Sequence, residues 1–176
     1  MPSKPPGEHM SNVRTALAAL AELLAPDAPD VGKRVLSAHD EPAEFVRAHA
    51  DQLDERRIDE PIPGLAWIAL VDALTDHGLL AEVDWKEDPA EVVAQLKALR
   101  SAPAEWGWVG ETDTHVPTYD FLRAAGRRLR ALGTALVVLD IESDCYPLTL
   151  VPVDHVREVV DLAATAGHHA APLDEG

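Results

Sequence analysis

Basic residues are scarce in this sequence, which has 15 lysines and arginines against 31 aspartates and glutamates. The formal charge of −16 opposes binding to nucleic acid, because affinity for the phosphate backbone comes largely from lysine and arginine. A field of this sign also disfavours anionic membranes, whereas it attracts basic proteins and cations. We therefore expect no nucleic-acid or membrane partner and take a basic protein as the natural partner.

Cysteine is nearly absent as well. Cys145 is the single cysteine, which excludes an intramolecular disulfide and a cysteine zinc site and favours a reducing compartment. Long apolar runs are also missing: no window approaches the ~20 residues of a membrane-spanning helix, and residues 1–9 lack the apolar core of a signal peptide. These absences predict a cytoplasmic protein.

Complete catalytic motifs are not found in the chain. It has no Walker phosphate loop, no GxGxxG fingerprint, no GxSxG nucleophile elbow and no HExxH zinc helix. Nucleotide-binding, hydrolase and zinc-enzyme functions therefore lose their usual support. We predict no cofactor, and only a divalent cation is considered as an alternative.

The hydrophobic content, 47% of 176 residues, is sufficient for a folded core. Helical periodicity begins after Ser11, and the runs 80–85, 135–141 and 146–151 have the pattern of strands. Helices and strands do not alternate strictly, which favours an α+β fold with a small, mainly antiparallel sheet of about three strands packed against several helices. We expect one domain over residues 11–167, with flexible tails at 1–10 and 168–176.

Three acidic residues, Asp140, Glu142 and Asp144, follow the best strand pattern and span the expected hairpin turn. In one hypothesis they converge on a cleft and bind magnesium or calcium, because these cations prefer carboxylate oxygens. In the other, which we favour, they are turn residues whose side chains bond the local backbone. No glycine-bearing calcium loop accompanies them.

A second polar cluster joins the end of the strand at 80–85 to the start of a helix. It consists of Asp84, Trp85, Lys86, Glu87 and Asp88. Its carboxylates and lysine suit an acid/base pair or a ligand contact. The alternative, which we favour, is helix capping: Asp88 precedes a proline and stands three residues before a carboxylate, the pattern of a helix start.

Two segments carry a resemblance to a known family. The stretch 83–88, VDWKED, and the stretch 139–152, LDIESDCYPLTLVP, resemble an uncharacterised family of bacterial cytosolic proteins classed as a domain of unknown function. In that family a WKED-like junction precedes a helix, and an SD-x-YPL-x-LVP hairpin precedes the last helix. The likeness covers residues 65–167 and implies no activity. Glu142 stands where the family pattern has a small residue or glycine.

The resemblance directs attention to a set of residues in these two segments. They are Asp84, Trp85, Lys86, Glu87, Asp88, Ser143, Asp144 and Tyr146. With Asp140 they form the candidate functional surface.

Two functions from different classes fit these observations. The favoured hypothesis is a non-enzymatic interaction or regulatory domain, with an immunity-like or accessory role, that binds a basic protein. The alternative is a metal-assisted or acid/base enzyme whose site combines the carboxylates at 84–88 and 140–144, which requires the two junctions to converge. A third hypothesis is homo-oligomerisation through the hairpin edge or the Trp106–Trp108 segment; the sequence does not predict the oligomeric state.

Overall fold

The structure is a computed structural model that describes residues 6–106 and 116–174. The chain groups into two compact units. Unit 1 comprises residues 1–74 and 161–168, and unit 2 comprises residues 75–160 and 169–176. Two helices, α5 and α8, contribute residues to both units. Among the described residues, no helix combines the length and apolar character needed to cross a membrane.

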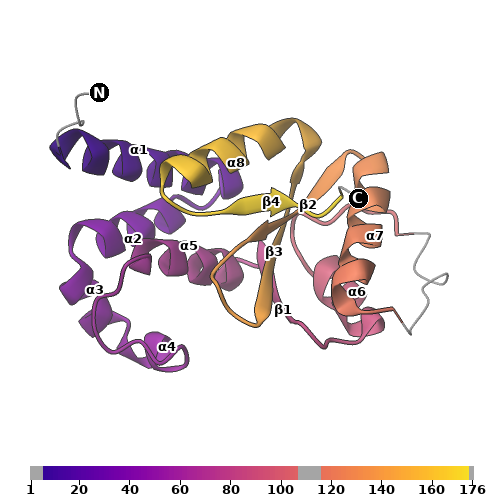
Figure 1. The fold of residues 1–176 in the computed structure, drawn as a ribbon, viewed down its shortest axis with the longest axis horizontal. Helices are drawn as coiled ribbons and strands as arrows, with labels where there is room; N and C mark the ends of the chain where they lie inside the picture. The colour runs from indigo at the N-terminus through magenta and orange to yellow at the C-terminus, as the bar shows by residue number, and fades with distance from the viewer. Residues whose placement is uncertain (1–5, 107–115, 175–176) are drawn as a thin grey trace. The chain divides into compact units, whose positions relative to one another are not determined.

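Unit 1 is helical. Its elements are α1 (Pro6–Leu24), α2 (Pro29–Asp40), α3 (Pro42–Ala48), α4 (Ala50–Asp54), most of α5 (Leu65–Asp76) and the end of α8 (Val156–Thr165) (Figure 1). Three of the helices begin with proline in the first turn, where a missing N–H costs nothing. The most apolar of these helices is α5, which buries nine residues.

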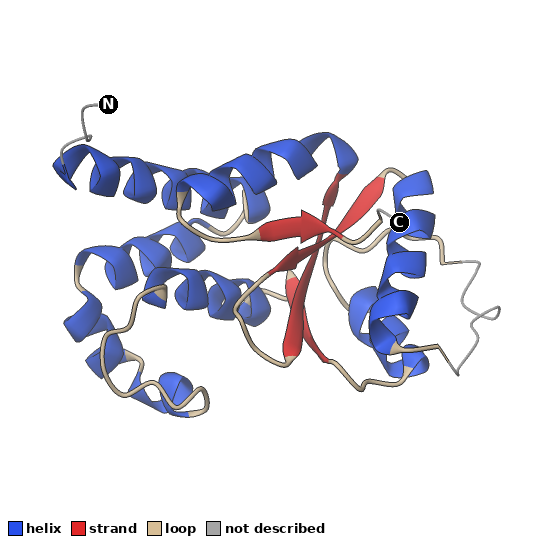
Figure 2. Ribbon diagram, in the orientation of Figure 1, coloured by secondary structure: helices blue, strands red, loops and turns tan. Residues whose placement is uncertain are grey.

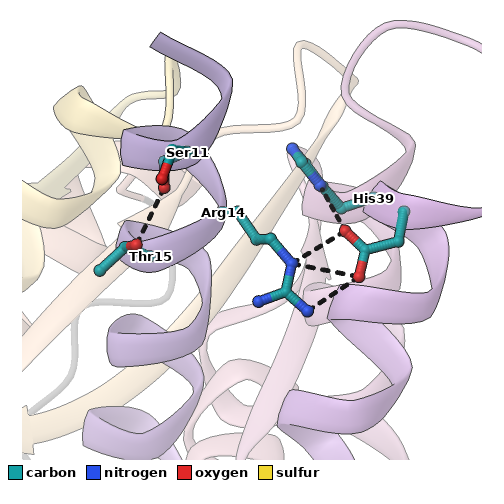
Figure 3. Close-up of polar contacts among 5 residues, drawn as sticks. Ser11, Arg14, Thr15 and His39 are labelled. Carbon is teal, nitrogen blue, oxygen red and sulfur yellow. Dashed lines mark hydrogen bonds and ion pairs between the residues drawn. The ribbon is translucent and has the colours of Figure 1, made fainter. Parts of the chain in front are cut away.

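Helix α1 begins earlier than expected. The helical periodicity begins after Ser11, but the helix starts at Pro6, inside the tail expected over residues 1–10, and the Ser11 carbonyl accepts a hydrogen bond from Thr15 Oγ1 within it (Figure 3). Residues 6–10 are all exposed, so their turns of helix have no apolar periodicity that a sequence pattern could reveal.

An ion pair links α1 to α2 at the surface of unit 1. Arg14 Nε donates to Asp40 Oδ1 at 2.9 Å, and His39 Nδ1 lies 3.1 Å from the same oxygen (Figure 3). The hydrogen bond from Arg14, followed by that from His39, lowers the pKa of Asp40 to about 2. The carboxylate is therefore ionised throughout the physiological range.

Unit 2 is built around an antiparallel sheet of four strands. They are β1 (Leu80–Asp84), β2 (Thr134–Leu139), β3 (Cys145–Pro152) and β4 (Ala170–Pro172), in the order β1-β3-β2-β4 (Figure 2). Strands β2 and β3 form the expected hairpin, and β1 pairs with the other side of β3. The α+β class and the antiparallel sheet are confirmed, with one strand more than the three expected.

Helices α6 (Pro89–Lys97) and α7 (Thr118–Ala131) cover one face of this sheet (Figure 1). Their buried residues pack in a single core with every second residue of the strands. The strand residues of this core are Val83, Leu136, Leu148 and Leu150, with Ala81, Val138 and Tyr146 partly buried beside them. Period-two alternation therefore defines which strand residues lie on the helix-covered face.

In the C-terminal segment, for which we predicted a flexible tail over residues 168–176, the described residues 168–174 make contacts in both units. His168 stacks on Trp67 in unit 1, with ring centroids 4.5 Å apart, and in unit 2 residues 170–172 form β4 against β2. Leu173 is 5% exposed and its N–H donates to the Leu136 carbonyl at 2.9 Å. The short sequence Ala-Ala-Pro has little strand propensity, so long-range pairing decides its structure.

Two helical glycines should respond in opposite ways to alanine. A Cβ at Gly126 in α7 would lie 2.0 Å from the Leu173 carbonyl oxygen, whereas one at Gly32 in α2 would make an ordinary 3.8 Å contact with Ala21. We expect Gly32→Ala to stabilise by about 1 kcal/mol, since alanine favours helix, and Gly126→Ala to destabilise by about 2 kcal/mol through overpacking. Denaturant unfolding measures both. A stabilised Gly126→Ala variant would contradict the docking of the C-terminal segment on α7.

A buried carboxylate in the apolar helix α5 should be important for stability. Asp72 is 4% exposed and accepts a hydrogen bond from Arg56 Nε at 2.9 Å. Either single substitution breaks this pair and leaves one of its charges in a poorly solvated position, so we expect Asp72→Leu or Arg56→Met alone to cost about 3 kcal/mol in unfolding free energy. The double variant should recover a large part of that loss, because it removes both charges of the pair. If the two losses simply add, the pair is not coupled.

Candidate functional site

The antiparallel pairing of β1 with β3 brings the two predicted motifs together. In this register Val83 lies opposite Tyr146 and Asp84 opposite Cys145. The pairing continues beyond β1, because the backbone N–H of Trp85 donates to the Asp144 carbonyl at 3.1 Å. The WKED junction and the hairpin turn therefore adjoin at one end of the sheet.

The carboxylates of the WKED junction bond to nearby backbone groups. Asp84 Oδ1 accepts from the Lys86 N–H at 2.9 Å, and Glu87 Oε1 accepts from the Asp88 N–H at 3.3 Å. Asp88 is the N-cap of α6, with its Oδ1 accepting from the Ala90 N–H at 2.8 Å. The predicted cap is confirmed. These bonds hold the junction in one conformation and leave its remaining side chains to point outward.

The hairpin turn is organised in the same way. Asp140 Oδ1 accepts from the Glu142 N–H at 2.7 Å, and Ser143 Oγ accepts from the Cys145 N–H at 3.2 Å. The Asp140 N–H donates to His169 O at 3.0 Å, so this end of the turn adjoins the segment leading into β4, whereas Asp144 adjoins β1. Asp140 and Asp144 therefore lie on opposite sides of the turn.

Helix α7 adds a third element to this end of unit 2. Thr118, at its first position, is buried and donates from Oγ1 to the Glu87 carbonyl at 3.0 Å. The next residue, Tyr119, is 45% exposed, and its ring centroid lies 6.0 Å from that of Tyr146. The start of α7 is therefore fastened to the WKED junction and presents a tyrosine beside the hairpin.

Aromatic side chains are exposed where these three elements meet. Trp85 is 51% exposed, and Lys86 Nζ lies 4.4 Å from the centre of a Trp85 ring. Tyr146 is half-buried beside the neighbouring Tyr119. We call the set Trp85, Tyr119, Asp144 and Tyr146 the aromatic surface. An exposed tryptophan whose backbone is held by hydrogen bonds at the junction of two turns is more typical of a binding surface than of a core.

A metal-assisted site requires that the two junctions adjoin and that several of their ligating side chains converge. The junctions adjoin, as the enzyme hypothesis demands. Within residues 6–106 and 116–174, however, no group of three or more histidine, cysteine, aspartate or glutamate side chains is placed to hold a metal ion. Asp84, Asp88 and Asp140 each accept a hydrogen bond from a backbone N–H group, as capping and turn residues do.

The second candidate surface of the sequence analysis is described only in part. Trp106 donates from Nε1 to the Pro103 carbonyl at 2.8 Å and packs beside the core of unit 2. Trp108 lies outside the described residues. Trp106 therefore packs against the core of unit 2.

Tyr119 is a surface residue that was not among the candidates named from the sequence. The buried positions of α7 are Thr118, Phe121, Leu122, Ala125, Gly126 and Leu129. Tyr119 lies off this stripe, so a helical wheel alone would have predicted its exposure. Its proximity to Tyr146 has no signal in the local sequence.

A comparison with protein families identifies the relatives of the chain. A family model described as a domain of unknown function, DUF6630, matches residues 16–173. The chain belongs to the DUF6630 family. The match begins well before residue 65, where the resemblance seen in the sequence began, so the DUF6630 region includes most of unit 1. No curated protein and no solved structure matches the chain.

The turn residue Glu142 should limit stability. Its φ of 56° lies in the left-handed region, where a side chain costs about 1–2 kcal/mol and glycine costs little. We expect Glu142→Gly to raise the unfolding free energy by about 1 kcal/mol, after the loss from a more flexible unfolded chain. The control is Asp59→Gly, an exposed residue without a positive φ, which should lower stability slightly. Denaturant unfolding of both tests this, and destabilisation by Glu142→Gly would contradict the turn geometry.

Proposed function

We propose that the chain is a non-enzymatic interaction domain that binds a basic protein through the aromatic surface. The observation that carries the proposal is the exposed ring of Trp85, which stands beside the acidic residues of two adjoining turns. The activity is recognition: the domain would act by occupying or positioning its partner, in a regulatory or accessory role in the cytoplasm.

Charge supports a basic partner. The chain carries a net charge of −16, and the exposed Asp84, Asp88, Asp120 and Asp144 lie at the turns or helix start beside the aromatic surface. Complementary charge accelerates encounter and excludes acidic competitors. The same charge argues against nucleic acid, since phosphates would be repelled.

The geometry supports a preformed surface. Trp85 is joined to the hairpin by its backbone bond to Asp144, and Thr118 joins α7 to the junction. A surface held by such bonds loses little conformational entropy when a partner binds. Tryptophan and tyrosine are also the residues that most often dominate binding energy at protein interfaces.

The proposal predicts salt-sensitive binding to basic peptides. The full chain should bind an octapeptide of alternating lysine and glycine with an affinity that falls as sodium chloride rises, because salt screens the attraction. A glutamate–glycine octapeptide should not bind. Isothermal titration calorimetry at two salt concentrations measures this, and equal binding of both peptides would refute charge recognition.

A charge-matched pair of variants locates the binding. The double variant Asp84→Asn/Asp144→Asn should lose more affinity for the lysine peptide than the double variant Asp27→Asn/Asp51→Asn. The second variant removes the same charge from exposed positions of unit 1. Asparagine at residue 84 keeps a side-chain oxygen for the Lys86 N–H, so the junction should stay folded. Equal losses in the two variants would place the binding elsewhere.

A further inference from the structure

We infer that Trp85 receives an arginine side chain of the basic partner, and that Lys86 occupies this contact until the arginine displaces it. The inference rests on the proposed function and adds the chemistry of the contact and an internal competitor. It follows from the position of Lys86, the exposure of Trp85 and the acidic residue beside it.

The Trp85 ring already binds a cation within the chain. Lys86 Nζ is 4.4 Å from the ring centroid, inside the ~6 Å range of an attractive cation–π contact. Both residues are exposed, and the lysine stem is flexible. The ring face is therefore a cation-binding face whose present occupant can leave without disturbing any buried group.

Strand pairing brings an acidic residue beside Trp85. Trp85 directly follows β1 and Asp144 directly precedes β3, and the Trp85 N–H donates to the Asp144 carbonyl one step beyond the pair of Asp84 with Cys145. Both side chains are exposed. The proposed contact places the Asp144 carboxylate within reach of the hydrogen-bond donors of a long cationic side chain stacked on Trp85.

Two tyrosines lie near the same turn. Tyr146 is in β3, two residues after Asp144, and its ring centroid lies 6.0 Å from that of Tyr119. Asp144 therefore has Trp85 as its backbone partner across the strand pair and Tyr146 two residues further along its own segment.

An indole ring with a carboxylate nearby favours binding of arginine over lysine. A guanidinium is planar, so it can stack on an indole and still donate two parallel hydrogen bonds to a carboxylate. An ammonium is more strongly hydrated and has no planar fork to match a carboxylate. The partner is therefore expected to present an arginine from an exposed basic segment, and Lys86 is a weaker occupant that such an arginine can replace.

Two octapeptides of equal charge test the selectivity on the full chain. One alternates arginine with glycine and the other alternates lysine with glycine, and calorimetry gives the two dissociation constants at low salt. The wild-type chain should bind the arginine peptide at least about fivefold more tightly. Trp85→Ala should reduce arginine-peptide affinity about tenfold and remove most of the difference between the peptides.

The competitor is tested by removing its charge. Lys86→Gln should raise affinity for the arginine peptide about threefold, because the ring no longer has to be vacated. Lys33→Gln is the matched control: it removes one exposed positive charge from α2 and changes the net charge equally. Its effect should be clearly smaller. Thermal unfolding of each variant shows whether it remains folded.

The outcomes separate this inference from the proposed function. If neither basic peptide binds the wild-type chain, the proposed function fails and the inference with it. If both bind and Trp85→Ala binds them unchanged, the arginine contact is wrong, whereas recognition of a basic segment by the acidic residues still stands if Asp84→Asn with Asp144→Asn weakens binding. If Lys86→Gln gains no more affinity for the arginine peptide than Lys33→Gln does, Lys86 does not compete with the arginine for the Trp85 ring. Arginine selectivity lost with Trp85, together with a gain specific to Lys86→Gln, supports the inference.

Discussion

The pairing of β1 with β3 is the constraint on which the candidate surface depends. It places Asp84 opposite Cys145 and lets the Trp85 N–H reach the Asp144 carbonyl, so two turns distant in sequence become neighbours. The bond from Thr118 to the Glu87 carbonyl then adds the start of α7. Without this pairing Trp85 would be an isolated exposed tryptophan, and the acidic turn would have no aromatic partner.

Local signals predicted the elements well because each depends on nearby residues. Asp88 before Pro89 predicted the start of α6, where Asp88 is the N-cap. The hairpin of β2 and β3 also follows from two β-rich runs flanking a polar turn. These features arise from propensity, capping and turn chemistry over a few residues, which a sequence displays directly.

Long-range contacts explain what the sequence did not reveal. Strand β4 forms because residues 170–172 pair with β2, and Ala-Ala-Pro has no strand pattern of its own. The candidate residues were identified from their types, but their arrangement was not: Asp140 and Asp144 stand on opposite sides of the turn, and Tyr119 joins Tyr146 from another element. Motif residues thus suggest a site, whereas strand pairing decides which of them meet.

The central claim is that the WKED junction, the hairpin turn and the start of α7 form one binding surface for a basic segment. The most direct measurement is an NMR titration of the full chain with the arginine–glycine octapeptide, following backbone amide signals. The account predicts that signals from residues 84–88, 118–120 and 144–146 shift together and saturate with a single dissociation constant. Shifts confined to one of these segments, or centred on the acidic residues of unit 1, would contradict it.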